Sequence, residues 1–519
     1  MLDADSFLHP FAGFDITSLI EAHSRHRGSH PFLIWALFDG PSETWSYARF
    51  ALEVAQVAGG LASRGVAPGE RVLLHLENCP EALIARFACA RLGAVCVATN
   101  AMAAGAELAY FAETTGAVGA LTQPKFSRLV SEHCRNLKWL ALTQTDAGGE
   151  PERGSAPERS ESFVSLHGEP LERRAPDPMA NASILFTTGT TARPKGAVWT
   201  HANLMWGAKL GALQQGIRAE DVCQIFLPLY HVVGLAWSLL PVLWAGATAL
   251  LQPRFSASRF WSAALEHRAT VGSQVIFTSQ ALAQQPVPAQ HRFRQWTDAR
   301  CLPEHESHFG LKVIGAWGMT EVVAQGIVGD PCLPQHPGSI GRPSLAYRIR
   351  IQNDDGRPAA PGETGNLAIS GVRGVSLFSG YFSDTSAEAF DADGYFQTGD
   401  RVLVHEDGSI EFADRAKDVL KVGGEGVSAA EIERVVLEVA GVKEVAVVGK
   451  SDPSYGEVAV AFVVPDPDAP KNIAENVIEA CRASLARFKV PREVILVSEL
   501  PRMGFGKIAK SELRERLRR

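Results

Sequence analysis

The chain has 519 residues, of which 46% are hydrophobic and 21% are charged, and its formal net charge is −7. This length excludes a small disulfide-stabilised domain, and the composition excludes a chain that is disordered throughout. A mildly acidic protein is also a poor candidate for broad binding to nucleic acid or to an anionic membrane surface.

The eight cysteines are sparse, and none lies in a CxxC pair or a tight cluster with histidine. Free thiols in a reducing compartment are therefore expected. The N-terminus has acidic residues and no basic segment before an apolar run, so it does not resemble a signal peptide. The most apolar stretch, residues 235–251, is interrupted by Pro241 and Gly246 and is too short to cross a bilayer comfortably. We expect a cytoplasmic protein without a membrane span.

Helical and strand patterns alternate through the first 180 residues. Residues 52–61 keep roughly helical apolar spacing, 71–76 form a strand pattern, 81–92 a helix and 94–98 another strand. This order predicts a βαβ unit, which favours parallel pairing with a helix on the face of the sheet.

The residue composition and the apolar pattern change twice further along the chain. Residues from about 145 to 181 are rich in Gly, Pro, Glu, Arg and Ser, which predicts a surface connection or a subdomain boundary. Apolar strands and helices alternate again from 182 to about 346. Short β-rich runs separated by Gly, Asp and Pro turns then predict a small antiparallel sheet or barrel over 348–412.

The last hundred residues predict a separate compact unit. Ser428 and Glu431 have the spacing of a capping box that opens a helix. Strands are expected at 444–448, 458–464 and 493–497, and a second helix at 473–485.

The sharpest motif is Ile184-Leu-Phe-Thr-Thr-Gly-Thr-Thr-Ala-Arg-Pro-Lys-Gly196, an apolar strand followed by a loop rich in hydroxyls and glycine. Free backbone N–H groups, threonine hydroxyls and one lysine suit a polyphosphate. The order around Lys195 is not that of a Walker A loop, since Pro194 precedes it and Gly196 follows it. A flexible turn is the alternative interpretation.

Two further segments have functional and plain structural interpretations. In Gly315-Ala-Trp-Gly-Met-Thr-Glu321, Trp317 offers a face for a purine and Glu321 a hard carboxylate for Mg²⁺. In Gly394-Tyr-Phe-Gln-Thr-Gly-Asp400, the carboxylate can accept hydrogen bonds from a ribose diol. A core tryptophan with a solvated glutamate, and a hairpin turn, are the alternatives.

Two charged segments complete the set. Asp414-Arg-Ala-Lys-Asp-Val-Leu-Lys-Val-Gly-Gly-Glu425 lies at a composition boundary, and Pro501-Arg-Met-Gly-Phe-Gly-Lys507 carries a lysine between glycines. By themselves, a solvated linker and a surface charge would account for them.

Together, in this order, the five motifs resemble the adenylate-forming superfamily of acyl-CoA synthetases, luciferases and peptide-synthetase adenylation domains. Within it, residues 72–81, 290–294 and 308–321 are most similar to the carnitine/crotonobetaine-CoA ligase branch. The resemblance implies an α/β fold with a large N-terminal domain of stacked α/β subdomains and a small β-barrel, here residues 1–416. It also implies a small mobile α+β C-terminal domain, residues 417–519.

In this family a carboxylate attacks the α-phosphate of MgATP to give acyl-AMP and pyrophosphate, and a thiol, usually of coenzyme A, then displaces AMP. The resemblance implies that Thr320 binds the α-phosphate, Glu321 holds Mg²⁺, Asp400 takes the ribose hydroxyls with help from Arg415, and Lys507 bridges the substrate carboxylate and the α-phosphate. The expected loop over the β- and γ-phosphates comprises Thr187, Thr188, Gly189, Thr190, Thr191 and Lys195, and the expected adenine slot comprises Gly315, Ala316 and Trp317.

The family rotates its C-terminal domain between the two half-reactions, and the expected hinge is Lys417. Rotation would bring Gly423 and Gly424 beside the pantetheine arm of coenzyme A. His231, in Leu227-Pro-Leu-Tyr-His-Val-Val-Gly234, is expected at the junction of the acyl site and the CoA tunnel. Expected walls of the acid pocket, able to enclose a quaternary ammonium, a ring or a short chain, are Trp206, Tyr230, Val233 and Trp237.

Departures from the family pattern leave alternatives open. Gly426 replaces a frequent Asn, Trp317 stands where Tyr is common, and residues 297–300 replace the usual Gly-Gly-Ala segment. One alternative is an adenylating enzyme that passes the acyl group to a carrier-protein pantetheine, an amine or another nucleophile. Another is a nucleotide-binding regulatory protein without catalysis. The expected partners are a small or medium carboxylic acid, ATP, Mg²⁺ and coenzyme A, with a homodimer possible.

Overall fold

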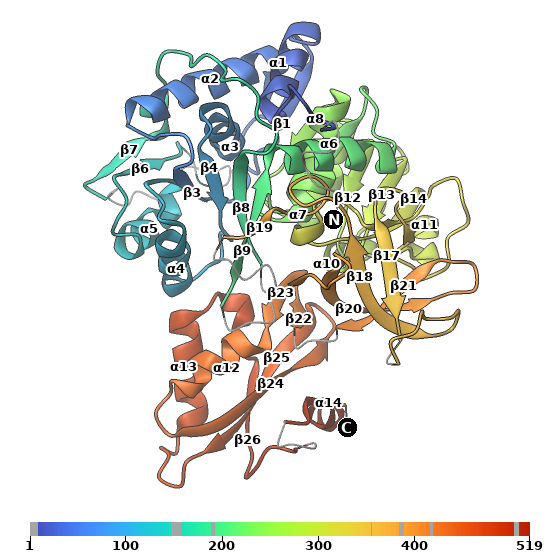
Figure 1. Ribbon diagram of the computed structural model, residues 1–519. Coiled ribbons are helices and arrows are strands. Elements are labelled where there is room, and N and C mark those ends of the chain that lie inside the picture. Colours follow the sequence, from blue (N-terminus) through green and yellow to red (C-terminus); the bar gives the residue numbers. More distant parts are fainter. Residues whose placement is uncertain are drawn as a thin grey trace. The chain divides into compact units, whose positions relative to one another are not determined.

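The computed structural model describes residues 9–144, 146, 157–187, 193–353, 355–382, 389–415, 419–502 and 508–518. The chain divides into two compact units, coloured along the sequence in Figure 1. The first comprises Met1–Ala101, Ala112–Leu185 and Gly196–Asp414, and the second comprises Met102–Phe111, Phe186–Lys195 and Arg415–Arg519.

One sheet of the first unit has, counted over the described residues, nine strands in the order β16-β15-β14-β13-β12-β10-β11-β1-β2. Its central pairs are parallel, whereas β2, β15 and β16 pair in the antiparallel sense at the edges. The strands are β1 (Pro31–Trp35), β2 (Glu43–Ser46), β10 (Val222–Ile225), β11 (Thr248–Leu251), β12 (Val271–Ser273), β13 (Gln295–Asp298), β14 (Lys312–Trp317), β15 (Ile327–Val328) and β16 (Arg342–Pro343).

A second sheet of this unit has eight described strands in the order β19-β9-β8-β4-β3-β5-β6-β7. Apart from the β19–β9 edge pair, the pairs for which a register is defined are parallel. The strands are β3 (Arg71–His75), β4 (Val95–Ala98), β5 (Gly119–Thr122), β6 (Trp139–Leu142), β7 (Ser160–Ser162), β8 (Asn181–Thr187), β9 (Lys195–Thr200) and β19 (Gly380–Tyr381).

The expected βαβ unit is confirmed in this second sheet. Strands β3 and β4 are parallel neighbours, with Arg71 opposite Val95, and α3 (Pro80–Leu92) connects them. Pro80 opens this helix and Gly93, at φ +87°, ends it, which is the usual distribution of these two residues at helix ends. Nearly every residue of α3 is buried, because the helix packs between the sheet and α2 (Tyr47–Ser63), as Figure 1 shows.

The remaining helical segments pack around these sheets or connect their strands. They are α1 (Ile16–His26), α4 (Gly105–Thr115), η2 (Pro124–Phe126), α5 (Ser127–His133), η3 (Phe163–Leu166), α6 (His201–Gln215), α7 (Val232–Gly234), the π-helical turn η4 (Leu235–Leu239), α8 (Leu240–Ala245), α9 (Ala257–Glu266), α10 (Ile276–Ala283), α11 (Pro303–Phe309) and η5 (Thr320–Val322).

The β-rich region also forms as expected. Four of its strands make a sheet in the order β17-β18-β20-β21, and the β17–β18 and β18–β20 pairs are antiparallel. These strands are β17 (Arg348–Gln352), β18 (Thr364–Ser370), β20 (Phe396–Val404) and β21 (Ile410–Arg415).

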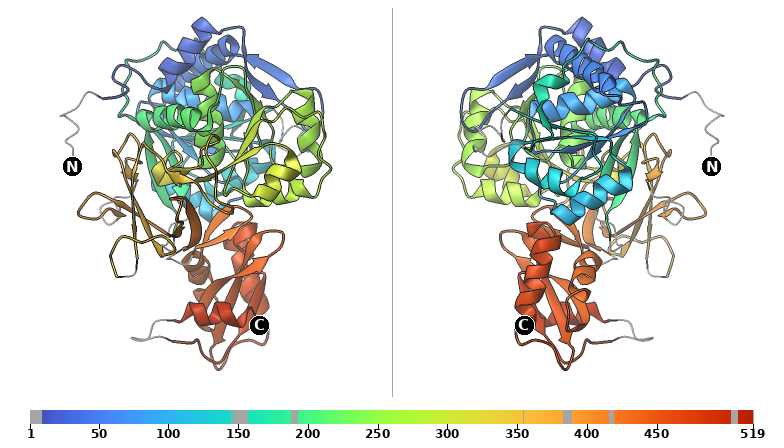
Figure 2. Two further views of the ribbon diagram at one scale, coloured as in Figure 1. Left: turned by 90° about the vertical axis from the view of Figure 1, so that its right-hand side faces the viewer. Right: turned by 90° about the vertical axis from the view of Figure 1, so that its left-hand side faces the viewer.

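The second unit, shown from further sides in Figure 2, contains a small sheet with helices on both faces. One face packs against α12 and α13, and the opposite face packs against Leu500 and against Leu513, which lies in α14. Alternate residues of the central strands supply the two cores, as the period of a strand requires. The elements are β22 (Val419–Val422), β23 (Glu425–Ser428), α12 (Ala429–Leu437), β24 (Val442–Asp452), β25 (Gly456–Pro465), α13 (Ile473–Ser484), η7 (Arg487–Lys489), β26 (Glu493–Leu496) and α14 (Lys510–Arg516).

The predicted start of α12 is confirmed, but the capping box is wrong. Ser428 precedes the helix without a capping side-chain hydrogen bond. The carboxylate of Glu431 instead accepts a hydrogen bond of 2.9 Å from Nζ of the buried Lys489. A buried ammonium group requires such a partner, and this requirement outweighs the local cap. Among the described residues, no helix is long and apolar enough to cross a membrane.

Candidate functional site

The segment Gly315–Glu321 runs from the end of β14 into the short turn η5. A Cβ atom on Gly315 would lie 2.2 Å from the carbonyl oxygen of Ser339, so only glycine fits there. A Cβ atom on Gly318 would lie 2.8 Å from the ring of Trp237. The glycines of this motif are therefore explained by close packing, and the packing brings Trp237 of the expected acid pocket against the expected adenine slot.

Three successive carbonyl groups at the end of this segment, those of residues 320–322, accept hydrogen bonds from three different parts of the chain. The indole N–H of Trp199 donates to the carbonyl of Thr320 (2.9 Å), and the Phe378 N–H donates to that of Glu321 (2.9 Å). The hydroxyl of Tyr347 donates to the carbonyl of Val322 (2.7 Å). These bonds fix the backbone that carries Thr320 and Glu321.

The next residue completes the turn in a strained conformation. Val323 has φ +68° and ψ −62°, and the Ala324 N–H donates to the carbonyl of Val322 over 2.8 Å. This is a γ-turn in a region that a β-branched residue rarely adopts. Val323 is fully buried, so packing maintains the turn.

The carboxylate of Glu321 is buried and oriented. Only 3% of the residue is exposed, and the hydroxyl of Tyr381 donates to its Oε1 over 2.7 Å. Burial, together with the neighbouring carboxylate, raises the pKa of Tyr381, so this hydroxyl keeps its proton and remains a donor. A fixed carboxylate oxygen is the type of ligand that Mg²⁺ prefers, so this residue fits the ion.

The residue expected to contact adenine and the residue expected to bind ribose are joined by a hydrogen bond. The indole N–H of Trp317 donates to Oδ2 of Asp400 over 2.8 Å, and both residues are buried. Trp317 ends β14 and Asp400 lies in β20, so the bond joins the nine-stranded sheet to the β-rich region.

The ends of the expected phosphate loop lie on the strands β8 and β9. The hydroxyl of Thr187 donates to the carbonyl of Lys195 over 3.5 Å, and the hydroxyl of Tyr110 donates to that of Pro194 over 3.2 Å. The predictions for the middle of the loop, Thr188, Gly189, Thr190 and Thr191, lie outside the described residues, as do those for Lys417 and Lys507.

His231 precedes α7, and contacts with its sequence neighbours help to fix its position. The Val233 N–H approaches its Nδ1 at 3.4 Å, and its own N–H donates to the carbonyl of Pro228 at 3.0 Å. A Cβ atom on Gly234 would lie 2.2 Å from that same carbonyl, so the glycine permits the tight turn. The preceding segment is anchored by the buried Asn78, whose amide donates to the carbonyl of Leu227 (3.1 Å).

The expected walls of the acid pocket have different surroundings. The indole N–H of Trp206 donates to the hydroxyl of Tyr347 (3.0 Å). Trp237 and Val233 are buried, and Tyr230 is partly buried. Trp237 lies in the π-helical turn η4, where its carbonyl accepts from the amide of Gln215 (2.9 Å). Such turns are frequent at functional sites.

In the second unit, Gly423 and Gly424 form the two-residue loop between β22 and β23, with φ +60° and +91°. Positive φ at both positions suits the hairpin and explains the glycines through the turn alone. Gly426, the expected departure near the CoA side, pairs with Lys421 in the same hairpin. Arg415 ends β21.

Sequence reasoning missed the residues that orient the motif: Trp199, Tyr347 and Tyr381. Each is separated from its partner in 320–322 by at least 25 positions, so no local spacing could reveal it. The unusual segment 297–300 is fixed by a buried hydrogen bond and by burial of its carboxyl group. Thr297 donates to the side chain of Gln215 (2.8 Å), and burial raises the pKa of Asp298.

Comparison with known proteins gives concordant results. The AMP-binding enzyme family matches residues 20–382, and the AMP-binding enzyme C-terminal domain matches residues 431–507. A crotonobetaine/carnitine–CoA ligase from Escherichia coli is 32% identical over 506 residues, which are 94% of this chain and 96% of the relative.

Solved structures agree over nearly the whole chain. An o-succinylbenzoate CoA synthetase from Bacillus subtilis matches with TM-score 0.81 and 25% identity, covering 96% of this chain and 98% of that chain. ATP-bound MatB from Rhodopseudomonas palustris matches with TM-score 0.67 and 26% identity, covering 97% and 99%. With its motifs in the family's order and both family models matched, the chain belongs to the AMP-binding enzyme family.

Proposed function

We propose that this protein activates a small or medium carboxylic acid with ATP and transfers the acyl group to coenzyme A. Its family membership supports the proposal, as do the crotonobetaine/carnitine–CoA ligase and the o-succinylbenzoate CoA synthetase named above. The observation that carries it is the fixed arrangement of Glu321, Thr320 and Asp400 around the Gly315–Glu321 segment.

In the first half-reaction, a carboxylate oxygen of the acid forms a bond to the α-phosphorus of ATP, and the bond from that phosphorus to the bridging oxygen of pyrophosphate breaks. In the second, the sulfur of coenzyme A bonds to the acyl carbon and AMP leaves. Because two anions must meet in the first step, the site must supply positive charge and orientation.

The individual roles proposed here are those that the resemblance to the family implies. Thr320 donates to the α-phosphate, and Asp400, held by Trp317, accepts from the ribose hydroxyls. Glu321, held by Tyr381, would bind Mg²⁺, which supplies charge neutralisation when bound. Lys195 and the threonines at 187–191 contact the β- and γ-phosphates, and Lys507 contacts the substrate carboxylate and the α-phosphate.

The domain boundary is proposed at 416/417, with Lys417 as the hinge. The two family matches end at 382 and begin at 431, and the compact units change at Asp414, which supports a boundary between these points. Gly423 and Gly424 then contact the pantetheine arm. His231 lies at the entrance from the acyl site, beside walls formed by Trp206, Tyr230, Val233 and Trp237. The eight free cysteines suit a reducing, cytoplasmic setting.

A screen of pyrophosphate release tests the proposal. Carnitine, crotonobetaine, aryl acids, bile acids and short fatty acids are supplied with MgATP, and products are analysed with and without coenzyme A. At least one acid should stimulate release, and a CoA thioester should form. Glu321→Gln should lower the rate on the order of a hundredfold, because a charge contact to the transition state is lost.

The exposed Glu304 provides the matched control, and Glu304→Gln should keep full activity. Release that no acid stimulates would contradict the ligase. An acyl-AMP that forms normally but passes only to an amine or a carrier protein would contradict the CoA step alone.

A further inference from the structure

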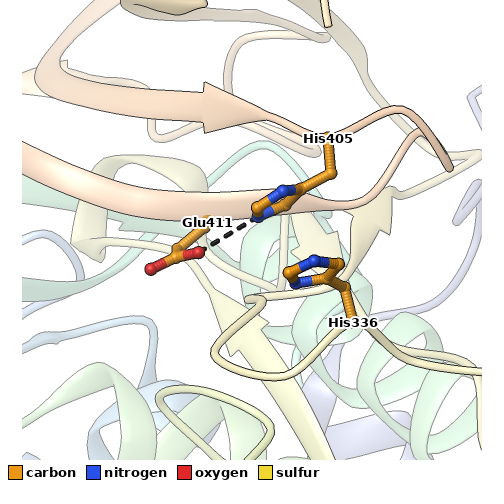
Figure 3. Close-up of side chains that lie close together, drawn as sticks. All are labelled: His336, His405 and Glu411. Atoms are coloured by element: carbon orange, nitrogen blue, oxygen red, sulfur yellow. Dashed lines mark hydrogen bonds and ion pairs between the residues drawn. The ribbon is translucent and has the colours of Figure 1, made fainter. Parts of the chain in front are cut away.

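A cluster of metal-ligating side chains lies in the first unit and is not used by the proposed reaction. His336, His405 and Glu411 each offer a ligand atom, and these atoms all lie within 4.8 Å of one another. Figure 3 shows the two imidazole rings facing each other beside the carboxylate. The ring centroids are 3.7 Å apart with an interplanar angle of 17°.

The fold brings these side chains together from two segments far apart in the sequence. His405 follows β20 and Glu411 lies in β21, across a turn closed by the bond from His405 N–H to the Ser409 carbonyl (2.9 Å). The loop that carries His336 is attached to the same strand, because the Ile340 N–H donates to the Ile410 carbonyl (2.8 Å). The backbone therefore holds all three residues in place.

The ring nitrogens and the carboxylate lie near one another, although the two rings are stacked. Nε2 of His405 lies 3.0 Å from Oε2 of Glu411, so these two atoms face the same space. Nδ1 of His336 lies 2.9 Å from the carbonyl of Pro337, a contact that requires the proton on Nδ1 and leaves the lone pair on Nε2. Such a bond from the second ring nitrogen to a carbonyl is how metal-ligating histidines are usually oriented.

We propose that His336, His405 and Glu411 bind a zinc ion. Two imidazole nitrogens and one carboxylate oxygen form a common donor set for Zn²⁺, with a water molecule in the fourth position. Bond lengths near 2.0–2.2 Å place such donors roughly 3.4 Å apart. Because the two rings are stacked, one imidazole would rotate out of the stack to bind the ion. The ion replaces the proton shared by His405 and Glu411, and that proton is released to solvent.

The site would connect β14, which carries the expected adenine slot, to the hairpin formed by β20 and β21. Gln335, next to His336, donates to the carbonyl of Val313 (3.1 Å) and accepts from the Gly315 N–H (3.3 Å). A bound ion would therefore fix the loop that packs over Gly315. Zinc would stabilise the folded protein without taking part in the reaction.

The test uses the full chain, stripped of metal with a chelator, and zinc chloride as the probe. Zinc affinity and stoichiometry are measured by competition with a chromophoric chelator, with excess Mg²⁺ and without ATP or acid. The wild type should bind one Zn²⁺. In each of His336→Ala, His405→Ala and Glu411→Gln, the affinity for this ion should be at least tenfold weaker. Zinc should also raise the melting temperature of the wild type but not of these variants.

His133→Ala, at an exposed histidine outside the cluster, is the matched control and should bind zinc as the wild type does. Glu411→Gln keeps the size of the side chain, so it decides the matter if an alanine variant folds poorly. Equal zinc affinity and stoichiometry in the wild type and the cluster variants would overturn the site. Because neither nucleotide nor acid is present, this outcome is independent of the ligase activity.

Discussion

The hydrogen bond from Trp317 to Asp400 couples two side chains that the proposed function assigns to different parts of one nucleotide. A carboxylate that is 3% exposed needs a donor, and the indole N–H provides one at 2.8 Å. The bond keeps one carboxylate oxygen occupied and so determines the direction in which the other can accept from a ribose. In the proposed function, Trp317 therefore positions Asp400 in addition to offering a face for adenine.

Trp317→Phe should raise KM for ATP about tenfold with little change in kcat. The lost bond to a charged group is worth about 1.5–3 kcal/mol, and about 1.4 kcal/mol corresponds to a factor of ten. The measurement is the ATP dependence of pyrophosphate release, repeated with 2′-deoxy- and 3′-deoxy-ATP. The penalty should shrink with the deoxy analogues, because Asp400 then has less to bind.

Trp261→Phe is the matched control, since this buried indole N–H has no hydrogen-bond partner among the described residues. An equal rise in KM for both variants, or a penalty that the deoxy analogues do not change, would refute the coupling.

At the scale of single elements, the second unit depends on a buried lysine. Lys489 in η7 is 4% exposed, and its Nζ contacts the carboxylates of Glu107 and Glu431, both also buried. Burial raises the pKa of Glu431 against the opposing attraction of Lys489. The three groups therefore stabilise one another only as a set, and α12 begins with its glutamate turned inward instead of capping.

Lys489→Met should destabilise the second unit by about 3–5 kcal/mol, since it leaves two buried carboxylates without their cation. Denaturant unfolding of the full chain, followed by hydrogen exchange over 419–502, measures the effect. Adding Glu107→Gln and Glu431→Gln to this variant should recover part of the loss.

The control for this prediction is Lys471→Met, at an exposed lysine of the same unit. If both lysine variants lose the same stability, the buried set has no special role.

For the whole molecule, the proposal of two half-reactions predicts that they can be separated by mutation. Lys507→Ala should lower acid-dependent pyrophosphate release on the order of a hundredfold or more, yet still convert supplied acyl-AMP to thioester. Lys417→Pro should spare adenylation and block thioester formation, because proline fixes φ at the hinge. Both half-reactions are assayed separately on each variant, with Lys443→Ala at an exposed lysine as control. Similar damage to both half-reactions in both variants would contradict a rotating domain.

Most regular elements could be predicted from sequence where the apolar pattern was strong. The units β3–α3–β4 and β24–β25 are examples, because each contains continuous apolar runs of strand or helix length that the fold buries. The edge strand β7 (Ser160–Ser162) was predicted only as part of a connection. Its three residues are polar, and it forms by pairing with β6, which no local pattern encodes.

In the candidate site, too, some features could be predicted from sequence and others could not. The motif residues Trp317, Glu321 and Asp400 could be named from sequence, because their types and order match a family. Their hydrogen-bond partners could not, since the contact between Trp199 and Thr320 joins residues 121 positions apart. The cluster of His336, His405 and Glu411 was also missed for this reason, because His336 is far from the other two residues along the chain.

The γ-turn at Val323 has a consequence for how this enzyme can vary. A conformation of this kind costs about 1–3 kcal/mol and persists only when its surroundings over-determine it. Weakening the donors at Trp199 or Tyr347 would let the turn relax to an ordinary backbone shape and would carry Glu321 away with it. We therefore expect those two aromatic positions and the valine to change together in evolution or in a mutant library, although only Val323 is near Glu321 in sequence.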